Sequence, residues 1–257
     1  MGARQAHVKR WIERLTGRHI ERVGRRSYAL VDPESRADAW CAPHWQMQRA
    51  MEDFGVDLVL DVGAHEGSFA RRLRRDYSGE LHSFEPVTAT FAKLQAASAG
   101  DSRWHVHQLA LGRSNASATI HVAANSVFSS LLPSNSFSDI RFKTESSMVR
   151  DEAIAVRRLD QLLREQVPDI DRRRVFLKTD TQGYDLEVFE GLGDLQSCVV
   201  LMLAEVSLIP IYEGMPHWTD SLARYERAGF SPIGMVPVTW DGNRVIEYDC
   251  LMTRAAA

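Results

Sequence analysis

One stretch of ten residues, numbers 58–67, constrains the fold of this chain more than any other. It reads LVLDVGAHEG, an apolar run of branched side chains followed by Asp61 and by two glycines, Gly63 and Gly67. The apolar run is too short for a buried helix and is typical of a buried parallel strand. We therefore expect a strand over residues 58–60 that ends in a glycine turn.

Helical periodicity begins directly behind this turn. Phe69, Leu73 and Tyr77 recur at four-residue spacing among arginines, which predicts an amphipathic helix that starts near Ser68. Strand, glycine loop and helix together form the opening of a nucleotide-binding βαβ unit. Glycine is expected in the turn because a Cβ there would obstruct a ligand that approaches the backbone closely.

The loop lacks the glycine spacing of a dinucleotide site. A pyrophosphate-binding loop requires G-x-G-x-x-G, whereas Ala64 and His65 occupy the middle of this motif. Asp61 also puts a carboxylate where an anionic pyrophosphate would bind. A positively charged ligand fits better, and S-adenosylmethionine carries both a sulfonium and an amino group. A purely structural turn and an NAD-dependent oxidoreductase are the alternatives.

A second short strand also closes on an acid. It covers residues 81–84 and is followed by Glu85 and Pro86. Glu85 lies 24 positions after Asp61, about where an acidic residue binds ribose hydroxyls in such folds. Pro86 lacks an amide hydrogen and stiffens the exit from the strand.

With a third motif, KTDTQGYD at residues 178–185, the sequence resembles the FkbM family of class I S-adenosylmethionine-dependent methyltransferases. The resemblance covers roughly residues 57–252. It implies that Leu109 and Ala110 lie against the adenine and that Ser130 lies near the methionine end of the cofactor. The predicted cofactor-binding residues are Asp61, Gly63, His65, Gly67, Ser68, Glu85, Pro86, Leu109, Ala110, Ser130 and Asp180.

The predicted architecture is a doubly wound, mostly parallel, seven-stranded Rossmann-like α/β domain over residues 57–257. An N-terminal helical extension over residues 1–56 precedes it. The last two strands are expected to pair antiparallel, because a turn signal at residues 241–243 separates them. Residues 123–147 shift to Ser, Asn and Phe with little periodicity, which predicts a functional loop and a candidate substrate lid.

Four of the expected strands end in acids, namely Asp61, Glu85, Asp180 and Glu205. The carboxyl ends of parallel strands border the ligand crevice of an open sheet, so these carboxylates should meet there. That many carboxylates repel one another unless cations or hydrogen-bond donors share them. Asp61 and Glu85 are assigned to the methionine and ribose ends of the cofactor, which leaves Asp180 and Glu205 for the acceptor.

Methyl transfer to an alcohol requires that a base or a metal ion remove the hydroxyl proton. Asp180 and Glu205 carry oxygen ligands that Mg²⁺ accepts, so we expect them to act directly or through Mg²⁺. Gln182 stands where other family members often have Glu, which weakens the case for a metal. The alternative for Asp180 is a helix cap. His217 is an alternative base.

Charge, cysteine content and the length of apolar stretches limit the possible partners and cellular locations of the protein. The net charge of −3 argues against nucleic acid as a bulk partner. Three cysteines without C-x-x-C spacing predict reduced thiols in a cytoplasmic protein, with neither a zinc site nor disulfides built on them. No apolar stretch approaches the roughly 20 residues needed to span a bilayer, and the first residues lack a signal-peptide core.

Residues 4–26 carry eight basic side chains, and four apolar ones share one helical face: Val8, Trp11, Ile12 and Leu15. A basic amphipathic helix can bind an anionic membrane or a partner, or pack against its own domain. A domain with a complete sheet leaves this stripe uncovered, so we expect a homodimer with the helix at or near the interface.

Together these features predict an O-methyltransferase that transfers a methyl group from S-adenosylmethionine to a hydroxyl group. The resemblance implies an acceptor that is a sugar, an oligosaccharide or a glycosylated metabolite, because family members methylate sugars in natural products and bacterial glycans. An NAD-dependent oxidoreductase and a non-catalytic S-adenosylmethionine-binding protein are the alternative functions.

Overall fold

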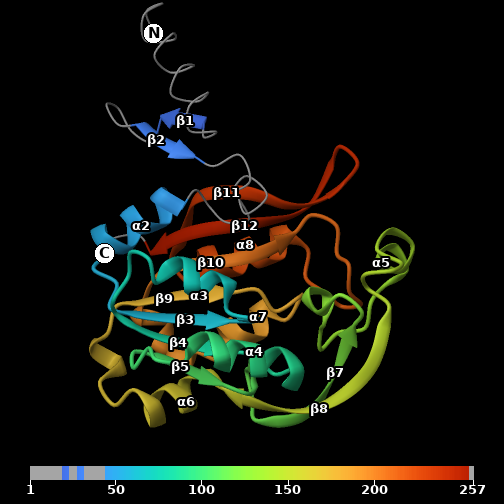
Figure 1. Cartoon of the computed structure of the whole chain (residues 1–257), viewed down its shortest axis with the longest axis horizontal. Helices are drawn as coiled ribbons and strands as arrows, with labels where there is room; N and C mark the ends of the chain where they lie inside the picture. The colour runs from blue at the N-terminus through green and yellow to red at the C-terminus, as the bar shows by residue number, and fades with distance from the viewer. Residues whose placement is uncertain (1–18, 23–27, 32–43, 255–257) are drawn as a thin grey trace, which may run out of the picture.

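The computed structural model of the chain describes residues 19–22, 28–31 and 44–254. Seven strands form the main sheet: β3 (Leu58–Val62), β4 (Glu80–Phe84), β5 (Trp104–His107), β9 (Val175–Thr179), β10 (Val199–Ser207), β11 (Phe230–Asp241) and β12 (Arg244–Arg254). Their order across the sheet is β11-β12-β10-β9-β3-β4-β5 (Figure 1). Strand β12 pairs antiparallel with β10 and β11, and the remaining pairs are parallel. The predicted doubly wound sheet with an antiparallel end is confirmed.

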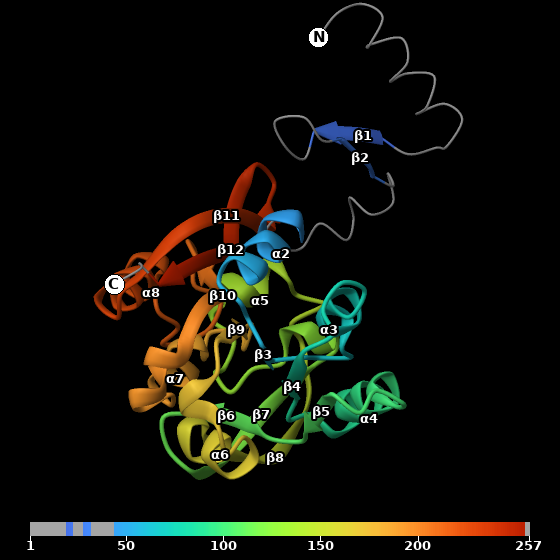
Figure 2. The ribbon, with the colours of Figure 1, turned by 90° about the vertical axis from the view of Figure 1, so that its left-hand side faces the viewer.

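Helices cover both faces of this sheet (Figure 2). One face packs against α2 (His44–Asp53), α3 (Ser68–Leu73) and α4 (Thr88–Ser98), and the other against α6 (Leu159–Gln166), α7 (Asp185–Glu190) and α8 (Trp218–Arg227). Successive side chains of a strand point to opposite faces of the sheet. Val59 therefore packs in the core under α2, α3 and α4, and Leu58 and Leu60 pack in the core under α6, α7 and α8. Burial on both faces explains the uninterrupted apolar run.

A second sheet of three strands borders the first (Figure 1). Its members are β6 (Ala110–Gly112), β7 (Ala116–Ala123) and β8 (Met148–Arg158), in the order β6-β8-β7. Residues 124–147, here called the cover segment, connect β7 to β8 and contain η2 (Ser126–Phe128) and α5 (Ser136–Arg141). The amide of Ala124 donates to the carbonyl of Ser147 at 2.8 Å, which closes the two ends of the segment on each other.

Short 3₁₀ turns, η3 (Ile170–Arg172) and η4 (Gly193–Cys198), lead into β9 and β10. Two short strands, β5 and β6, follow each other closely in the chain but belong to different sheets. The chain leaves the edge of the main sheet there, so that Leu109 and Ala110 form a wall of the cavity described below. The helix that begins at Ser68 ends at Leu73, one turn earlier than its apolar spacing predicted.

The predicted N-terminal helical extension is wrong at residues 19–22 and 28–31. Two strands, β1 (His19–Arg22) and β2 (Tyr28–Val31), pair antiparallel there instead of forming a helix. Their aromatic and β-branched residues favour extended backbone, which the helical interpretation of residues 4–26 overlooked. The last part of the extension is helical, as predicted, and forms α2.

The apolar stripe of Val8, Trp11, Ile12 and Leu15 lies outside the described residues, as does Cys41. The homodimer and the cytoplasmic location therefore stay predictions. In the described part of the chain, no helix combines the length and the apolar character that crossing a bilayer requires.

Gly63 provides a test of how closely the loops after β3 and β9 approach. Its φ is +74°, and a Cβ there would lie 1.9 Å from the backbone carbonyl oxygen of Asp180. We expect Gly63→Ala to lower the free energy of unfolding by about 3 kcal/mol or more, because left-handed strain and a clash with backbone add together. Urea denaturation measures this loss.

Gly242→Ala is the matched control. Its φ of +60° is equally unfavourable for alanine, yet no atom lies within 4 Å of the added Cβ. Only the strain of about 1–2 kcal/mol should remain. Equal losses in the two variants would contradict the close approach of the two loops.

Candidate active site

The carboxyl ends of β3, β4, β9 and β10 border a cavity of about 990 Å³. It lies where the strand order reverses, between β3 and β9, the place at which open α/β sheets bind ligands. The cover segment lines one side of it through residues 125–131 and 141–142. The predicted site residues that line the cavity are Gly63, His65, Ser68, Glu85, Pro86, Leu109, Ala110, Ser130, Asp180 and Glu205.

Three predicted site residues do not line this cavity. Asp61 is fully buried beneath it. Gly67 has a φ of +81°, and a Cβ there would lie 2.9 Å from Leu94, so this glycine permits close packing behind the loop. His217 precedes α8, and its Nδ1 lies 2.8 Å from the hydroxyl of Thr219.

A buried ion pair joins β3 to β9 under the cavity. The Oδ1 of Asp61 lies 3.3 Å from the Nζ of Lys178, and the hydroxyl of Ser83 donates to Asp61 Oδ2 at 3.2 Å. Lys178 also donates to the carbonyl of Gly63 at 2.9 Å and lies 3.5 Å from Asp180 Oδ2. Burial acts to lower the pKa of Lys178, but the carboxylates of Asp180 and Asp61 raise it above its ordinary value. Lys178 is therefore a fixed cation that holds both loops.

Glu85 is held by two backbone amides. Val87 donates to its Oε1 at 2.9 Å, and His65 donates to its Oε2 at 3.0 Å. His65 directs its amide inward because it adopts a φ of +50°, which is uncommon outside glycine. Burial raises the pKa of Glu85 to about 7, although the two amides act to lower it. The charge of this carboxyl group therefore changes close to neutral pH.

Gln182 connects the acids on the acceptor side. Its Nε2 donates to Asp180 Oδ1 at 3.3 Å and to Glu205 Oε2 at 3.1 Å. The hydroxyl of Tyr212 lies 2.8 Å from its Oε1, and the hydroxyl of Ser130 donates to its backbone carbonyl at 2.7 Å. Gln182 is also left-handed, with a φ of +54°. These contacts fix an amide group between two carboxylates.

This amide occupies the position predicted for Mg²⁺. Mg²⁺ requires oxygen ligands in near-octahedral geometry, and a donor NH₂ group between Asp180 and Glu205 does not fit that requirement. Among the side chains of residues 44–254, the cluster with three converging metal-ligand atoms lies elsewhere, at Glu80, His82 and His105. The structure does not support the predicted Mg²⁺ site.

Lys178 and two acids of β12 belong to the site although they were not among the predicted site residues. Asp249 pairs with Glu205 across the antiparallel strands, and Glu247 accepts a hydrogen bond from Ser207 at 3.1 Å. Burial raises the pKa of Glu247 to about 7, and burial together with neighbouring carboxylates raises the pKa of Glu205 well above its ordinary value. Glu247 and Asp249 occupy alternate positions of β12, a strand of the predicted antiparallel pair. This alternation of acids in an apolar strand could have identified them as site residues.

The cavity lining has more acids than bases. It contains the carboxyl groups of Glu85, Glu145, Asp180, Glu205, Glu247 and Asp249, against the basic groups of Arg72, Arg141 and Lys178. Burial raises the pKa of four of these groups, those of Glu85, Glu205, Glu247 and Asp249, so the six acids are not all ionised near neutral pH. A positively charged ligand suits this lining because it favours the ionised forms of these acids.

The buried ion pair can be tested by stability. Lys178→Met should lower the free energy of unfolding by about 3–5 kcal/mol, because it leaves the Asp61 carboxylate buried without its cation. Adding Asp61→Asn should recover part of this loss, which a double-mutant cycle in urea measures.

Lys93→Met is the matched control, since Lys93 pairs with Glu66 at 2.6 Å while its side chain is 65% exposed. An exposed pair of this kind contributes at most about 1 kcal/mol. Similar losses of unfolding free energy for Lys178→Met and Lys93→Met would mean that the buried pair stabilises the fold no more than an exposed pair does.

Comparisons with known proteins agree with this geometry at the level of the family. Residues 61–232 match the model of the methyltransferase FkbM domain. No curated protein sequence matches the chain significantly.

Solved structures resemble the chain only distantly. One is magnesium protoporphyrin IX methyltransferase from Synechocystis, solved with bound SAM, at a TM-score of 0.46 and 10% identity over 82% of this chain and 76% of that chain. Another is Aeropyrum pernix fibrillarin with natively bound S-adenosyl-L-methionine, at a TM-score of 0.45 and 10% identity over 93% of this chain and 83% of that chain.

The family match covers about two thirds of the 257 residues and includes the loops that surround the cavity. The chain belongs to the FkbM methyltransferase family.

Proposed function

We propose that the protein is an O-methyltransferase that transfers a methyl group from S-adenosylmethionine to a hydroxyl of a sugar, an oligosaccharide or a glycosylated metabolite. The observation that carries the proposal is the single cavity into which Glu85, Asp180 and Glu205 converge from the ends of three strands. Membership of the FkbM family supports methyl transfer and disfavours the NAD-dependent alternative.

The residues of the cavity fit S-adenosylmethionine. When bound, this cofactor would supply a methyl group on a positively charged sulfur, and the excess of acids in the lining suits that charge. We assign the ribose hydroxyls to Glu85, whose carboxylate accepts hydrogen bonds, and the adenine to the wall at Leu109 and Ala110. A volume of about 990 Å³ has room for the cofactor and part of an acceptor.

The remaining predicted cofactor contacts divide into two groups. Gly63, His65, Ser68 and Pro86 line the cavity, as does Ser130 of the cover segment. Asp61 is fully buried and acts indirectly, by holding Lys178. Gly67 permits the packing behind the loop.

We assign Asp180 as the group that accepts the acceptor's proton. Its side chain is 43% exposed and lines the cavity, so a hydroxyl group can reach its carboxylate. Lys178, 3.5 Å away, would stabilise the carboxylate before transfer. Glu205 orients the site through Gln182, because its raised pKa favours the neutral form and its Oε2 accepts from that amide. We propose that no Mg²⁺ takes part.

The acceptor assignment rests on the side chains that face the rest of the cavity. Trp240 and Thr239 of β11 and Arg141 and Glu145 of the cover segment all line it. An aromatic face beside hydrogen-bonding groups suits a hydroxyl-rich ring better than a flat apolar one. Trp218 of α8 packs against the core and does not line the cavity.

Cofactor binding should depend on pH through Glu85. Ribose hydroxyls donate to the ionised carboxylate, and the pKa of Glu85 is raised to about 7. Below that pH the carboxyl is protonated and must lose a proton on binding, so the affinity for S-adenosylhomocysteine should fall about tenfold between pH 8 and pH 6. Calorimetry across this range measures the fall. No binding at millimolar ligand would refute the proposed function.

Two variants sharpen this test. Glu85→Gln should bind more weakly at pH 8 and lose the pH dependence, because the amide does not titrate. Glu66→Gln lies in the same loop outside the cavity lining and should behave as the wild type does. A wild-type affinity that does not change with pH would remove Glu85 from the ribose contact.

Turnover tests the role of Asp180. Transfer of a labelled methyl group to a panel of glycosides should fall about 100-fold or more in Asp180→Asn, because the amide cannot accept the proton. Excess EDTA should leave the rate unchanged. Asp53→Asn is the control, since Asp53 forms an exposed ion pair with Arg49 on α2.

The other outcomes discriminate among the alternatives. Loss of turnover in EDTA that added Mg²⁺ reverses and added Zn²⁺ does not would restore Mg²⁺ as the group that activates the hydroxyl. An unchanged rate in Asp180→Asn would make Asp180 structural and His217 the next residue to replace. Binding of S-adenosylhomocysteine without turnover on any acceptor would favour the non-catalytic binding protein.

A further inference from the structure

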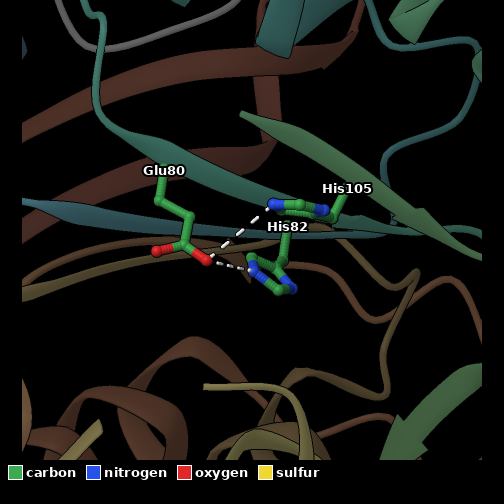
Figure 3. A group of neighbouring side chains, drawn as sticks. All are labelled: Glu80, His82 and His105. Atoms are coloured by element: carbon green, nitrogen blue, oxygen red, sulfur yellow. Dashed lines mark hydrogen bonds and ion pairs between the residues drawn. The ribbon is translucent and has the colours of Figure 1, made fainter. Parts of the chain in front are cut away.

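A cluster of two histidines and a glutamate lies outside the cavity, at the edge of the main sheet (Figure 3). Glu80 and His82 are two residues apart on β4, so their side chains point to the same face of the sheet. His105 lies on the edge strand β5, directly beside His82 in the parallel register. Strand pairing thus brings together three side chains that are separated by up to 25 residues in the chain.

The three ligand atoms surround one point. Glu80 Oε1 lies 3.1 Å from His82 Nε2 and 3.9 Å from His105 Nε2, and all three atoms lie within 4.8 Å of one another. Figure 3 shows both contacts meeting at one carboxylate oxygen. Ligands of a tetrahedral metal ion with bonds of about 2.1 Å are separated by about 3.4 Å. The observed distances lie on either side of this value.

The groups behind these ligands are also arranged as in a metal centre. His82 Nδ1 lies 3.0 Å from His107 Nε2, which leaves His82 Nε2 directed toward the cluster. The second oxygen of Glu80 accepts from Arg173 at 2.8 Å, which leaves Oε1 for the histidines. Metal-binding histidines and carboxylates are usually oriented by outer hydrogen bonds of this kind.

The local charge does not oppose a cation. Arg173 is the positive group closest to Glu80 in these contacts, and it also pairs with Asp57 at 3.2 Å and Asp169 at 3.3 Å. Three carboxylates thus share one guanidinium. An ion-pair network alone accounts for Arg173, but it does not require two imidazoles to converge on the oxygen that faces away from the arginine.

We propose that Glu80, His82 and His105 bind a divalent transition metal ion, with Zn²⁺ as the best match. Two imidazole nitrogens and one carboxylate oxygen form a donor set that suits Zn²⁺ and disfavours Mg²⁺. The side chain of His105 is 46% exposed, so a water molecule can complete the coordination from the solvent side. The bound ion would fasten the edge strand β5 to β4 and stabilise the sheet next to the cavity.

The experiment uses the full chain without a polyhistidine tag. Titration with Co²⁺ should give one equivalent of binding and the visible absorption of a tetrahedral ion, and Zn²⁺ should displace it. A hundredfold excess of Zn²⁺ over its Kd should raise the Tm by about 5–10 °C. No binding with 100 µM of either ion would overturn the proposal.

Two ligand variants and a matched control locate the site. His105→Ala and Glu80→Gln should each weaken Zn²⁺ binding about 100-fold or more and abolish the Tm increase. His105 is partly exposed, so its replacement should leave the fold intact, which circular dichroism checks. His121→Ala is the control. His121 also pairs with a carboxylate, that of Asp151 at 2.7 Å, but among the described residues this pair is not part of a group of three metal-ligand side chains. Unchanged binding in His105→Ala would overturn the assignment.

His107→Phe tests the outer hydrogen bond. Phenylalanine keeps a flat ring next to Phe84, whose ring lies 4.8 Å from that of His107, but removes the partner of His82 Nδ1. We expect one equivalent of Zn²⁺ to bind still, with an affinity about 10–100-fold lower. An unchanged affinity would remove His107 from the proposed centre.

Discussion

The ion pair between Asp61 and Lys178 is the contact on which the geometry of the site depends. The two residues are direct neighbours in the parallel register of β3 and β9, at the point where the sheet reverses its order. Removing two charges from water costs free energy, and this cost is offset only when their remaining hydrogen bonds are satisfied. Ser83 and the carbonyl of Gly63 contribute those bonds. Through Lys178, the loop after β3 and the carboxylate of Asp180 become parts of one network, which fixes the two sides of the cavity relative to each other.

Each of these two loops contains one residue other than glycine in the left-handed conformation. His65 turns its amide toward Glu85, and Gln182 directs its side chain between Asp180 and Glu205. Such conformations cost about 1–3 kcal/mol and persist only where surrounding contacts hold them. Those contacts come from the cover segment, because Ser126 lies 2.7 Å from the ring of His65 and Ser130 donates to the carbonyl of Gln182. Ordering of the cover segment and ordering of the two loops are therefore coupled.

The sequence predicted those features for which a local pattern of residues indicates a position in the whole fold. Buried strands appear as continuous apolar runs, and the acids at their ends mark the edge of the sheet. The seven-stranded main sheet with its antiparallel end could therefore be predicted, as could ten of the residues that line the cavity. What could not be predicted depends on contacts between distant segments. The break between β5 and β6 arises from a second sheet, and the position of the Gln182 amide is set by Tyr212 and by acids on other strands. The strands at residues 19–22 and 28–31 were hidden by a basic, helix-like pattern.

The closed ends of the cover segment have a consequence for how this fold can diversify. Because Ala124 and Ser147 are bonded to each other, residues 124–147 start and finish at adjacent points of the β7 and β8 pair. The entropy of closing a loop changes only slowly with its length, so insertions and deletions here leave the register of those strands intact. The side of the cavity that we assign to the cofactor is built mainly from the ends of β3 and β4 and the start of β6, and the segment adds Ser130 to it. The part of this segment that lies beyond Ser126 and Ser130, which contact His65 and Gln182, can thus be exchanged. Such an exchange would allow a relative to acquire a different acceptor while keeping the loops proposed to hold the methyl donor.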